Sequence, residues 1–155
     1  MTNLSRKARY GLRALYALAA DEARGPVLIA DLAERENIPR KFLEAILLEL
    51  KNAGVLKSKK GKGGGYALAR PADQITMGQI IRVIDGTLAP IPCASDTAFV
   101  RCEECPDEAT CGTRHVMKKV RDAVAGILDT TTLADVRAQI ARARHNAAAT
   151  VTYSI

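Results

Sequence analysis

Tryptophan is absent from this sequence, and other aromatic residues are scarce: two phenylalanines and four tyrosines occur among 155 residues. Because 48% of the residues are nevertheless hydrophobic, we expect a core built mainly from alanine, leucine, isoleucine and valine. The sequence also lacks any apolar run approaching the ~20 residues that a membrane-spanning helix requires. Its length suits one domain with a modest appendage. We therefore expect a small protein with no membrane partner.

Histidine is scarce as well. The two histidines, His115 and His145, fall at the start of an expected helix and in the expected C-terminal tail. No nucleophile stands beside a base in a pattern typical of covalent catalysis. We therefore expect that the protein is not an enzyme.

Acidic residues are outnumbered by basic ones, 17 to 23, which gives a net charge of +6 and favours a polyanionic partner. The N-terminal stretch joins basic residues to an Ala/Leu-rich run and could be mistaken for a secretory signal. However, Arg13 interrupts the run, and no small-residue cleavage site follows. We expect a cytoplasmic protein, in which thiols stay reduced.

Hydrophobic periodicity predicts a mainly α-helical fold with one small two-stranded wing. We expect helices over residues 5–21, 28–36 and 39–53, and then strands over residues 55–59 and 66–69. The tight turn between the second and third helices is typical of a helix-turn-helix. Gly54 is a natural left-handed stop for the third helix, and the glycines of KGKGGG allow a sharp turn between the strands.

Positive charge gathers on this winged helix-turn-helix. The wing carries four lysines: Lys57, Lys59, Lys60 and Lys62. A purely structural hairpin does not need four like charges that repel one another, whereas a wing lying along phosphate groups does. Arg40 and Lys41 begin the third helix, where base edges and phosphates would lie. We therefore predict double-stranded DNA as the partner.

Glu44 is the odd residue in this basic surrounding, and two interpretations stay open. It is either a solvated helix acid that neighbours Arg40 or Lys41, or an acceptor for the N4 amine of a cytosine in the major groove.

The C-terminal half is predicted to contain a capped helix, a loop and two further helices. Thr76 to Gln79 form a capping-box pattern for a helix that ends at Gly86. We expect a winged domain over 1–86 and a cysteine-rich loop over 87–112. A segment over 113–136 should contain a long helix (113–129) and a short terminal helix, and a tail over 137–155 should be mobile beyond about residue 145. Thr132 is the expected cap of the terminal helix, and apolar residues follow one face of the long helix: Val116, Val120, Val124 and Ile127.

All four cysteines lie in the loop or at its end, with the spacing C-x8-C-x2-C-x5-C: Cys93, Cys102, Cys105 and Cys111. Such clustering favours a metal or iron–sulfur site, with redox-active thiols or a structural role as alternatives. A zinc ribbon would need a second CxxC, which is missing. The loop is acidic, so only a bound cation or cluster would stabilise several thiolates there.

The run NIPRKFLEAILLELKNAGVLKSKKGKGGGYALARP resembles the recognition helix and wing of the IscR/NsrR/CymR family of bacterial winged-helix transcription regulators. SRKARYGLRAL, TMGQIIRVIDG and TTLADV also match that family, so the resemblance covers about residues 1–136. It implies a homodimer that pairs through the 113–129 helix and binds a pseudo-palindromic operator. It also places Lys41, Phe42 and Glu44 at recognition-helix contact positions and Lys60 at the wing tip.

The same resemblance implies an iron–sulfur cluster, [2Fe–2S] more than [4Fe–4S], whose binding state controls operator affinity. Cys93, Cys105 and Cys111 match the family's ligand cysteines, and Cys102 is an expected fourth ligand. His115 is the alternative, although it stands one residue beyond the family's ligand histidine position, which Arg114 occupies here. A regulator with structural zinc or redox thiols, and a partner-gated regulator of the CymR kind without a cluster, remain alternatives.

Overall fold

The computed structural model describes residues 4–152, and it is mainly helical with one two-stranded antiparallel sheet, as expected. The first helix, α1, spans Arg6–Ala20 and begins at Ser5, whose hydroxyl accepts a hydrogen bond from the Ala8 amide at 2.9 Å. Its apolar residues recur at helical spacing and are buried, among them Leu12 and Leu15. A single-turn helix, η1 (Glu22–Arg24), follows.

The helix-turn-helix consists of α2 (Ile29–Arg35) and α3 (Arg40–Asn52), close to the predicted bounds. Asn37 adopts a left-handed backbone (φ 48°) in the turn between them. Gly54 ends α3 with φ 72°, a conformation that glycine adopts without steric penalty. The buried stripe of α3 is the predicted one: Leu43, Ile46, Leu47 and Leu50.

The wing consists of β1 (Leu56–Lys59) and β2 (Gly65–Leu68), paired antiparallel from Leu56 opposite Leu68 to Lys59 opposite Gly65. Tyr66 also forms an isolated bridge with Val27, which ties the wing back to the segment before α2. At the tip, a Cβ on Gly64 would collide with the carbonyl oxygens of Lys59 and Gly61. The turn therefore requires glycine at this position.

A short turn, η2 (Ala72–Gln74), leads to α4 (Met77–Asp85), and the predicted capping box is only half formed. The Thr76 hydroxyl accepts from the Gln79 amide at 3.2 Å. The Gln79 side chain does not reach back to Thr76 but accepts from Arg70 at 2.8 Å, so it fastens α4 to the end of the wing.

The core is built from aliphatic residues of α1 to α4 and the wing, as the shortage of aromatics predicted. The largest fully buried side chains include Leu15, Leu32, Leu47 and Ile80. Leu133, the first residue of α6, is also fully buried, and its amide donates to the Ile75 carbonyl at 2.9 Å. The start of α6 is therefore anchored in the winged domain.

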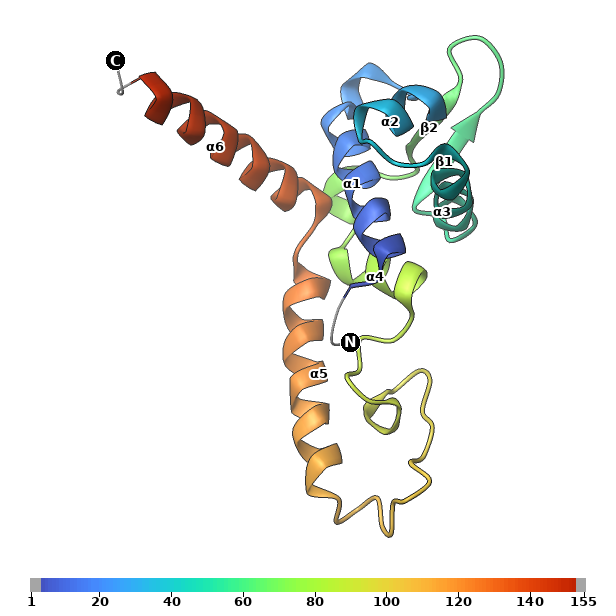
Figure 1. Cartoon of the computed structure of the whole chain (residues 1–155), viewed down its shortest axis with the longest axis vertical. Helices are drawn as coiled ribbons and strands as arrows, with labels where there is room; N and C mark the ends of the chain where they lie inside the picture. Colours follow the sequence, from blue (N-terminus) through green and yellow to red (C-terminus); the bar gives the residue numbers. More distant parts are fainter. Residues whose placement is uncertain (1–3, 153–155) are drawn as a thin grey trace.

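Two long helices, α5 (Gly112–Thr130) and α6 (Leu133–Thr152), complete the fold. Arg82 of α4 holds the end of α5 through a bidentate pair with Asp129 (Nη1–Oδ1 2.5 Å, Nη2–Oδ2 2.9 Å). Between α4 and α5 runs the cysteine segment, with the short helix η3 (Pro92–Ala94) near its start. Figure 1 shows this segment looping beside α5, while α6 projects away from the winged domain.

The prediction of a short terminal helix followed by a tail is wrong, because α6 continues to Thr152. The segment is rich in alanine and arginine and contains neither proline nor glycine, so nothing in it interrupts a helix. Thr132 and Asp135 cap it reciprocally: the Asp135 amide donates to the Thr132 hydroxyl at 3.1 Å, and the Thr132 amide donates to the Asp135 carboxylate at 2.9 Å. The last residues of the predicted tail, 153–155, lie outside the described part of the chain.

Within residues 4–152, no helix combines the length and the apolar composition that crossing a membrane would demand.

Candidate nucleic-acid interface and cysteine site

The exposed face of α3 carries the predicted DNA-contacting residues Arg40, Lys41, Phe42 and Glu44. Arg40 and Glu44 form an i, i+4 ion pair (Nε–Oε1 3.2 Å), and more than half of each side chain is exposed. Such an exposed pair contributes well under about 1 kcal/mol to stability. The ionic-neighbour interpretation of Glu44 is therefore correct for the free protein, and the pair is weak enough to open when a base or a phosphate competes for either partner.

Phe42 is 41% exposed and packs its ring against the edge of Tyr10 on α1 (centroids 5.7 Å apart, interplanar angle 83°). This contact fixes the N-terminal end of α3 on α1. The exposed part of the ring faces solvent, where an apolar contact with a thymine methyl group is chemically suitable.

The wing presents its lysines to solvent: Lys57, Lys59, Lys60 and Lys62 are all exposed. Within the described residues, none of the four forms an ion pair. Lys57 and Lys59 alternate with Ser58 along β1, so they point to the same face of the ribbon. The wing is thus an uncompensated cationic edge beside α3.

The cysteine segment brings Cys93 and Cys102 into contact, with 3.5 Å between their Sγ atoms. Cys93 lies in η3 and is buried, whereas Cys102 is exposed. Cys111 is the N-cap of α5, and its sulfur accepts a hydrogen bond from the Arg114 amide at 3.5 Å. Cys105 is half-buried and donates its amide to the Cys102 carbonyl at 3.2 Å, which closes a turn around the CxxC.

Burial raises the pKa of the Cys93 thiol, and the neighbouring Cys102 and Cys111 sulfurs raise it further. Both causes disfavour the thiolate form of Cys93 as long as no positive charge is bound beside it. A bound metal ion would reverse the effect, because thiolate ligands are stabilised by the cation that they bind.

Two arginines of α5 hold the start of the cysteine segment, and sequence reasoning did not identify either as a contact of that segment. Arg114 donates Nε to the Cys93 carbonyl at 2.9 Å, and its guanidinium lies 5.7 Å from the ring centre of Phe99. Arg121 donates to the Ala94 carbonyl at 2.6 Å and pairs with Asp96. The two arginines are seven residues apart, which places both on one face of the helix. This spacing was the only sequence feature that could have predicted their shared role.

The structure does not assemble a complete metal site. Among the described residues, no group of three or more His, Cys, Asp and Glu side chains is arranged to hold a metal ion. Cys93 interacts with Cys102 and Cys111, whereas no interaction of the His115 side chain with a cysteine occurs in the described part of the chain. The donor chemistry nevertheless suits a thiophilic metal: four thiols lie on one short segment, and a backbone N–H is already directed at one sulfur.

A helix-turn-helix, a glycine-tipped basic wing and a separate long helix together define a winged-helix DNA-binding regulator. The chain belongs to the Rrf2 family: the family profile described as an iron-dependent transcriptional regulator matches residues 4–139. The protein is therefore a transcription regulator of a DNA-binding family and not an enzyme.

Individual relatives agree with this assignment. An rrf2-like putative transcriptional regulator of Rhodobacter capsulatus is 40% identical over 139 residues, covering 87% of this chain and 92% of that protein. The structure resembles that of CymR, the global cysteine regulator of B. subtilis (TM-score 0.73, 36% identity, 90% of this chain and 98% of that one). It also resembles T. potens IscR (TM-score 0.70, 32% identity, 89% and 88%).

Proposed function

We propose that the protein is a homodimeric transcription regulator whose affinity for a pseudo-palindromic operator is controlled by an iron–sulfur cluster on the cysteine segment. The observation that carries the proposal is the contact of Cys93 with Cys102, on the same segment as Cys105 and as Cys111, the N-cap of α5. The description of the family as iron-dependent supports it.

The DNA-binding part rests on α3 and the wing. Arg40, Lys41, Phe42 and Glu44 are exposed on one end of α3, and Lys59, Lys60 and Lys62 are exposed on the wing. In this arrangement α3 enters the major groove and the wing follows the phosphates. Lysines without acidic partners suit the second task, because neutralising a phosphate with an unpaired lysine breaks no ion pair in the protein.

The dimer rests on the apolar stripe of α5. No residue of α5 is buried, and Val116, Val120 and Ile127 are 54%, 41% and 66% exposed. A helix that exposes a stripe of this kind along its length is typical of an interaction surface. We assign it to a second copy of the same helix, because two reading helices must be joined to bind two operator half-sites about one DNA turn apart.

The cluster would be held by Cys93, Cys105, Cys111 and Cys102, with His115 as the alternative to Cys102, and [2Fe–2S] is preferred over [4Fe–4S]. When bound, it supplies a one-electron redox centre that is sensitive to its surroundings. Residues of this chain would orient the ligands. The Arg114 amide donates to the Cys111 sulfur, and the Arg114 and Arg121 guanidinium groups fix the backbone around Cys93.

A route for coupling runs from this segment to the winged domain. The cysteine segment is attached to α5 by Arg114 and Arg121 and to the end of α4 by the chain itself. At that end, Asp85 accepts hydrogen bonds from the amide and the hydroxyl of Ser5, the N-cap of α1. Ordering of the segment would therefore change the orientation of α5 relative to the winged domain. Because α5 joins the two protomers, this change would alter the distance between the two α3 helices of the dimer.

The test is chemical analysis of anaerobically purified protein, with iron and acid-labile sulfide measured per monomer. Brown protein with visible absorption and both elements present is expected. Cys93→Ala, Cys105→Ala and Cys111→Ala should each abolish the colour while leaving a folded dimer. Cys102→Ala and His115→Ala, compared in parallel, identify the fourth ligand. Colourless protein with tightly bound zinc would instead favour a structural zinc site.

A second candidate function, thiol-based redox control, is favoured by the 3.5 Å contact between Cys93 and Cys102. A peroxide could oxidise the exposed Cys102 thiol to a sulfenic acid with release of water. The Cys93 thiol would then displace a second water molecule to form the disulfide. The variant Cys105→Ser/Cys111→Ser keeps this pair but lacks two ligands. Loss of two free thiols on peroxide treatment, with a mapped Cys93–Cys102 peptide, would support this function, and unchanged thiols would eliminate it.

The resemblance to CymR supports a third candidate, control by a protein partner in cysteine metabolism without a cluster. This candidate predicts that all four cysteine variants retain normal regulation.

A further inference from the structure

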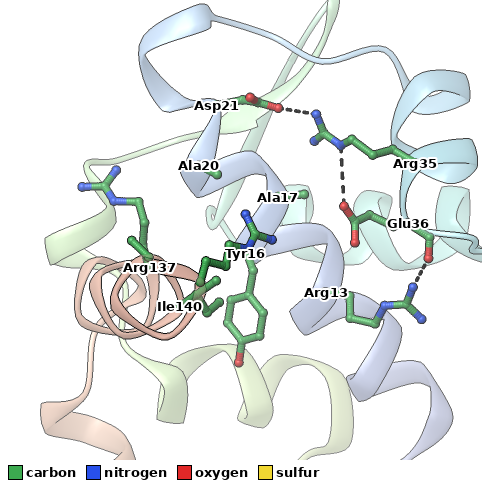
Figure 2. Close-up of a pocket in the computed structure, with 11 residues that line it drawn as sticks. Arg13, Tyr16, Ala17, Ala20, Asp21, Arg35, Glu36, Arg137 and Ile140 are labelled. Atoms are coloured by element: carbon green, nitrogen blue, oxygen red, sulfur yellow. Dashed lines mark hydrogen bonds and ion pairs between the residues drawn. The ribbon is translucent and has the colours of Figure 1, made fainter. Parts of the chain in front are cut away.

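We infer that a groove between α1, the end of α2 and α6 binds a small organic anion. Figure 2 shows Ala17 and Ala20 of α1 at its floor, with Arg137 and Ile140 of α6 on one side and Arg35 on the other. The groove has a volume of about 590 Å³, within the range that small-molecule sites occupy. None of the cysteines and none of the DNA-contacting residues lines it.

Arginine dominates the lining of this groove, with residues from three separate helices: Arg13, Arg35, Arg137 and Arg144. Among the residues that the structure describes, two carboxylates line it, those of Asp21 and Glu36. The lining of the groove therefore carries more positive than negative charge, and none of the wing lysines contributes to it.

Two of the four guanidinium groups are already neutralised. Arg35 pairs with Asp21 at 2.6 Å and with Glu36 at 3.5 Å, and Arg137 pairs with Glu22 at 2.9 Å while it also donates to the Ala19 carbonyl at 3.0 Å. These contacts hold α6 and α2 to the two sides of α1.

The other two guanidinium groups have no acidic partner within the described residues. Arg13 donates to the Glu36 backbone carbonyl and lies 6.0 Å from the ring centre of Tyr10, and neither contact offsets its charge. Arg144, one turn beyond Ile140 on α6, forms no ion pair in the described part of the chain. The groove thus brings two uncompensated cations together from α1 and α6.

The side chains that line the groove indicate which class of ligand it binds. A guanidinium group donates two parallel hydrogen bonds to a carboxylate or a phosphate, and this geometry suits both anions. Tyr16 adds a phenol whose pKa is raised by burial, so it remains an uncharged hydrogen-bond donor. The methyl groups of Ala17 and Ala20 and the side chain of Ile140 suit a short carbon skeleton. We therefore assign the site to a metabolite that carries carboxylate or phosphate groups.

Occupancy would have a structural consequence. An anion that neutralises Arg13 and Arg144 together joins α6 to the face of α1 that also touches the end of α2, the first helix of the helix-turn-helix. Because α6 follows directly from α5, restraining α6 changes the position of the proposed dimer helix relative to α3. The site would thus be a second input to operator binding, independent of the cysteines.

The experiment is isothermal titration of the full-length protein at low ionic strength with two probes, citrate for carboxylates and inorganic pyrophosphate for phosphates. At least one probe should bind with a Kd below about 1 mM. The variant Arg13→Gln/Arg144→Gln should weaken that binding about tenfold or more, because it removes both unpaired guanidinium groups. Binding of one probe but not the other identifies the class of anion.

The matched control is Arg6→Gln/Arg142→Gln, which removes the same charge from the same two helices at residues that do not line the groove. It should retain binding within about twofold, and the circular dichroism of both variants verifies the fold. Equal weakening in the two variants would reduce the effect to net charge and overturn the proposal. Absence of binding by both probes to the unsubstituted protein would overturn it as well. Neither outcome depends on whether a cluster is bound.

Discussion

The wing lysines permit a quantitative test of the DNA interface. Lys60 and Lys62 are exposed at the wing tip and have no ion-pair partner among the described residues, so Lys60→Gln/Lys62→Gln removes two charges without breaking an ion pair of the protein. Each phosphate contact contributes about 0.9 to the slope of log affinity against log salt concentration. A homodimer loses four such contacts, so the slope should become shallower by about 3.6.

This change in slope is large enough to measure directly. Between about 50 and 200 mM salt, a difference of 3.6 in slope corresponds to roughly a 150-fold smaller loss of affinity. Fluorescence anisotropy with operator DNA and with unrelated DNA, at four salt concentrations, gives the slopes. Both DNAs should show the change, because phosphates carry no sequence information. The control Arg6→Gln/Arg142→Gln should keep the original slope. A slope that stays unchanged in the wing variant would refute the placement of the wing on phosphate.

Three further predictions concern α3, α5 and the α4–α5 contact. Glu44→Ala should lose roughly 1–3 kcal/mol of discrimination at one base pair per half-site while leaving non-specific binding equal or tighter; a uniform loss over all sequences would mean that Glu44 only shapes the helix through its pair with Arg40. Val120→Asp places a carboxylate in the exposed apolar stripe of α5 and should yield monomers in sedimentation analysis, whereas an intact dimer would place the interface elsewhere. Arg82 lowers the pKa of Asp129 chiefly through its hydrogen bond, so this pair stabilises the fold at pH values above the usual carboxyl pKa, and the stability is lost as pH falls through the lowered one. The difference in urea midpoint between the protein and Arg82→Gln should therefore shrink on acidification, and a difference independent of pH would contradict the assignment.

Hydrophobic periodicity was sufficient to predict the helices of the winged domain, because each helix buries one regular stripe of apolar residues. The stripe of α3 from Leu43 to Leu50 and the stop at Gly54 are both as predicted. Local sequence motifs were less reliable for predicting the hydrogen-bond partner of a side chain that has several partners within reach. Gln79 matches a capping-box pattern, yet it bonds to Arg70, since a hydrogen bond between segments competes with the local one.

The C-terminal region was harder to predict. α6 carries no clear apolar stripe, so its length depends on intrinsic helix propensity and not on a periodic pattern from which its end could be predicted. In the cysteine segment, the spacing of the cysteines suggested candidate ligands, but it did not predict how their side chains are arranged. The contact of Cys93 with Cys102 and the anchoring by Arg114 and Arg121 depend on how the loop folds against α5, which has no local sequence signature.

Control of operator affinity by the state of the cysteine segment is the claim on which the proposed function depends, and a comparison of three samples tests it. Operator affinity is measured anaerobically for the protein as purified, for the same sample after chelation of iron, and for Cys93→Ala. Chelation should change the Kd for the operator about tenfold or more, and Cys93→Ala should match the chelated sample with or without chelator. Non-specific DNA binding should be the same in all three samples. Iron-containing protein whose operator Kd is unaffected by chelation and by Cys93→Ala would contradict the claim.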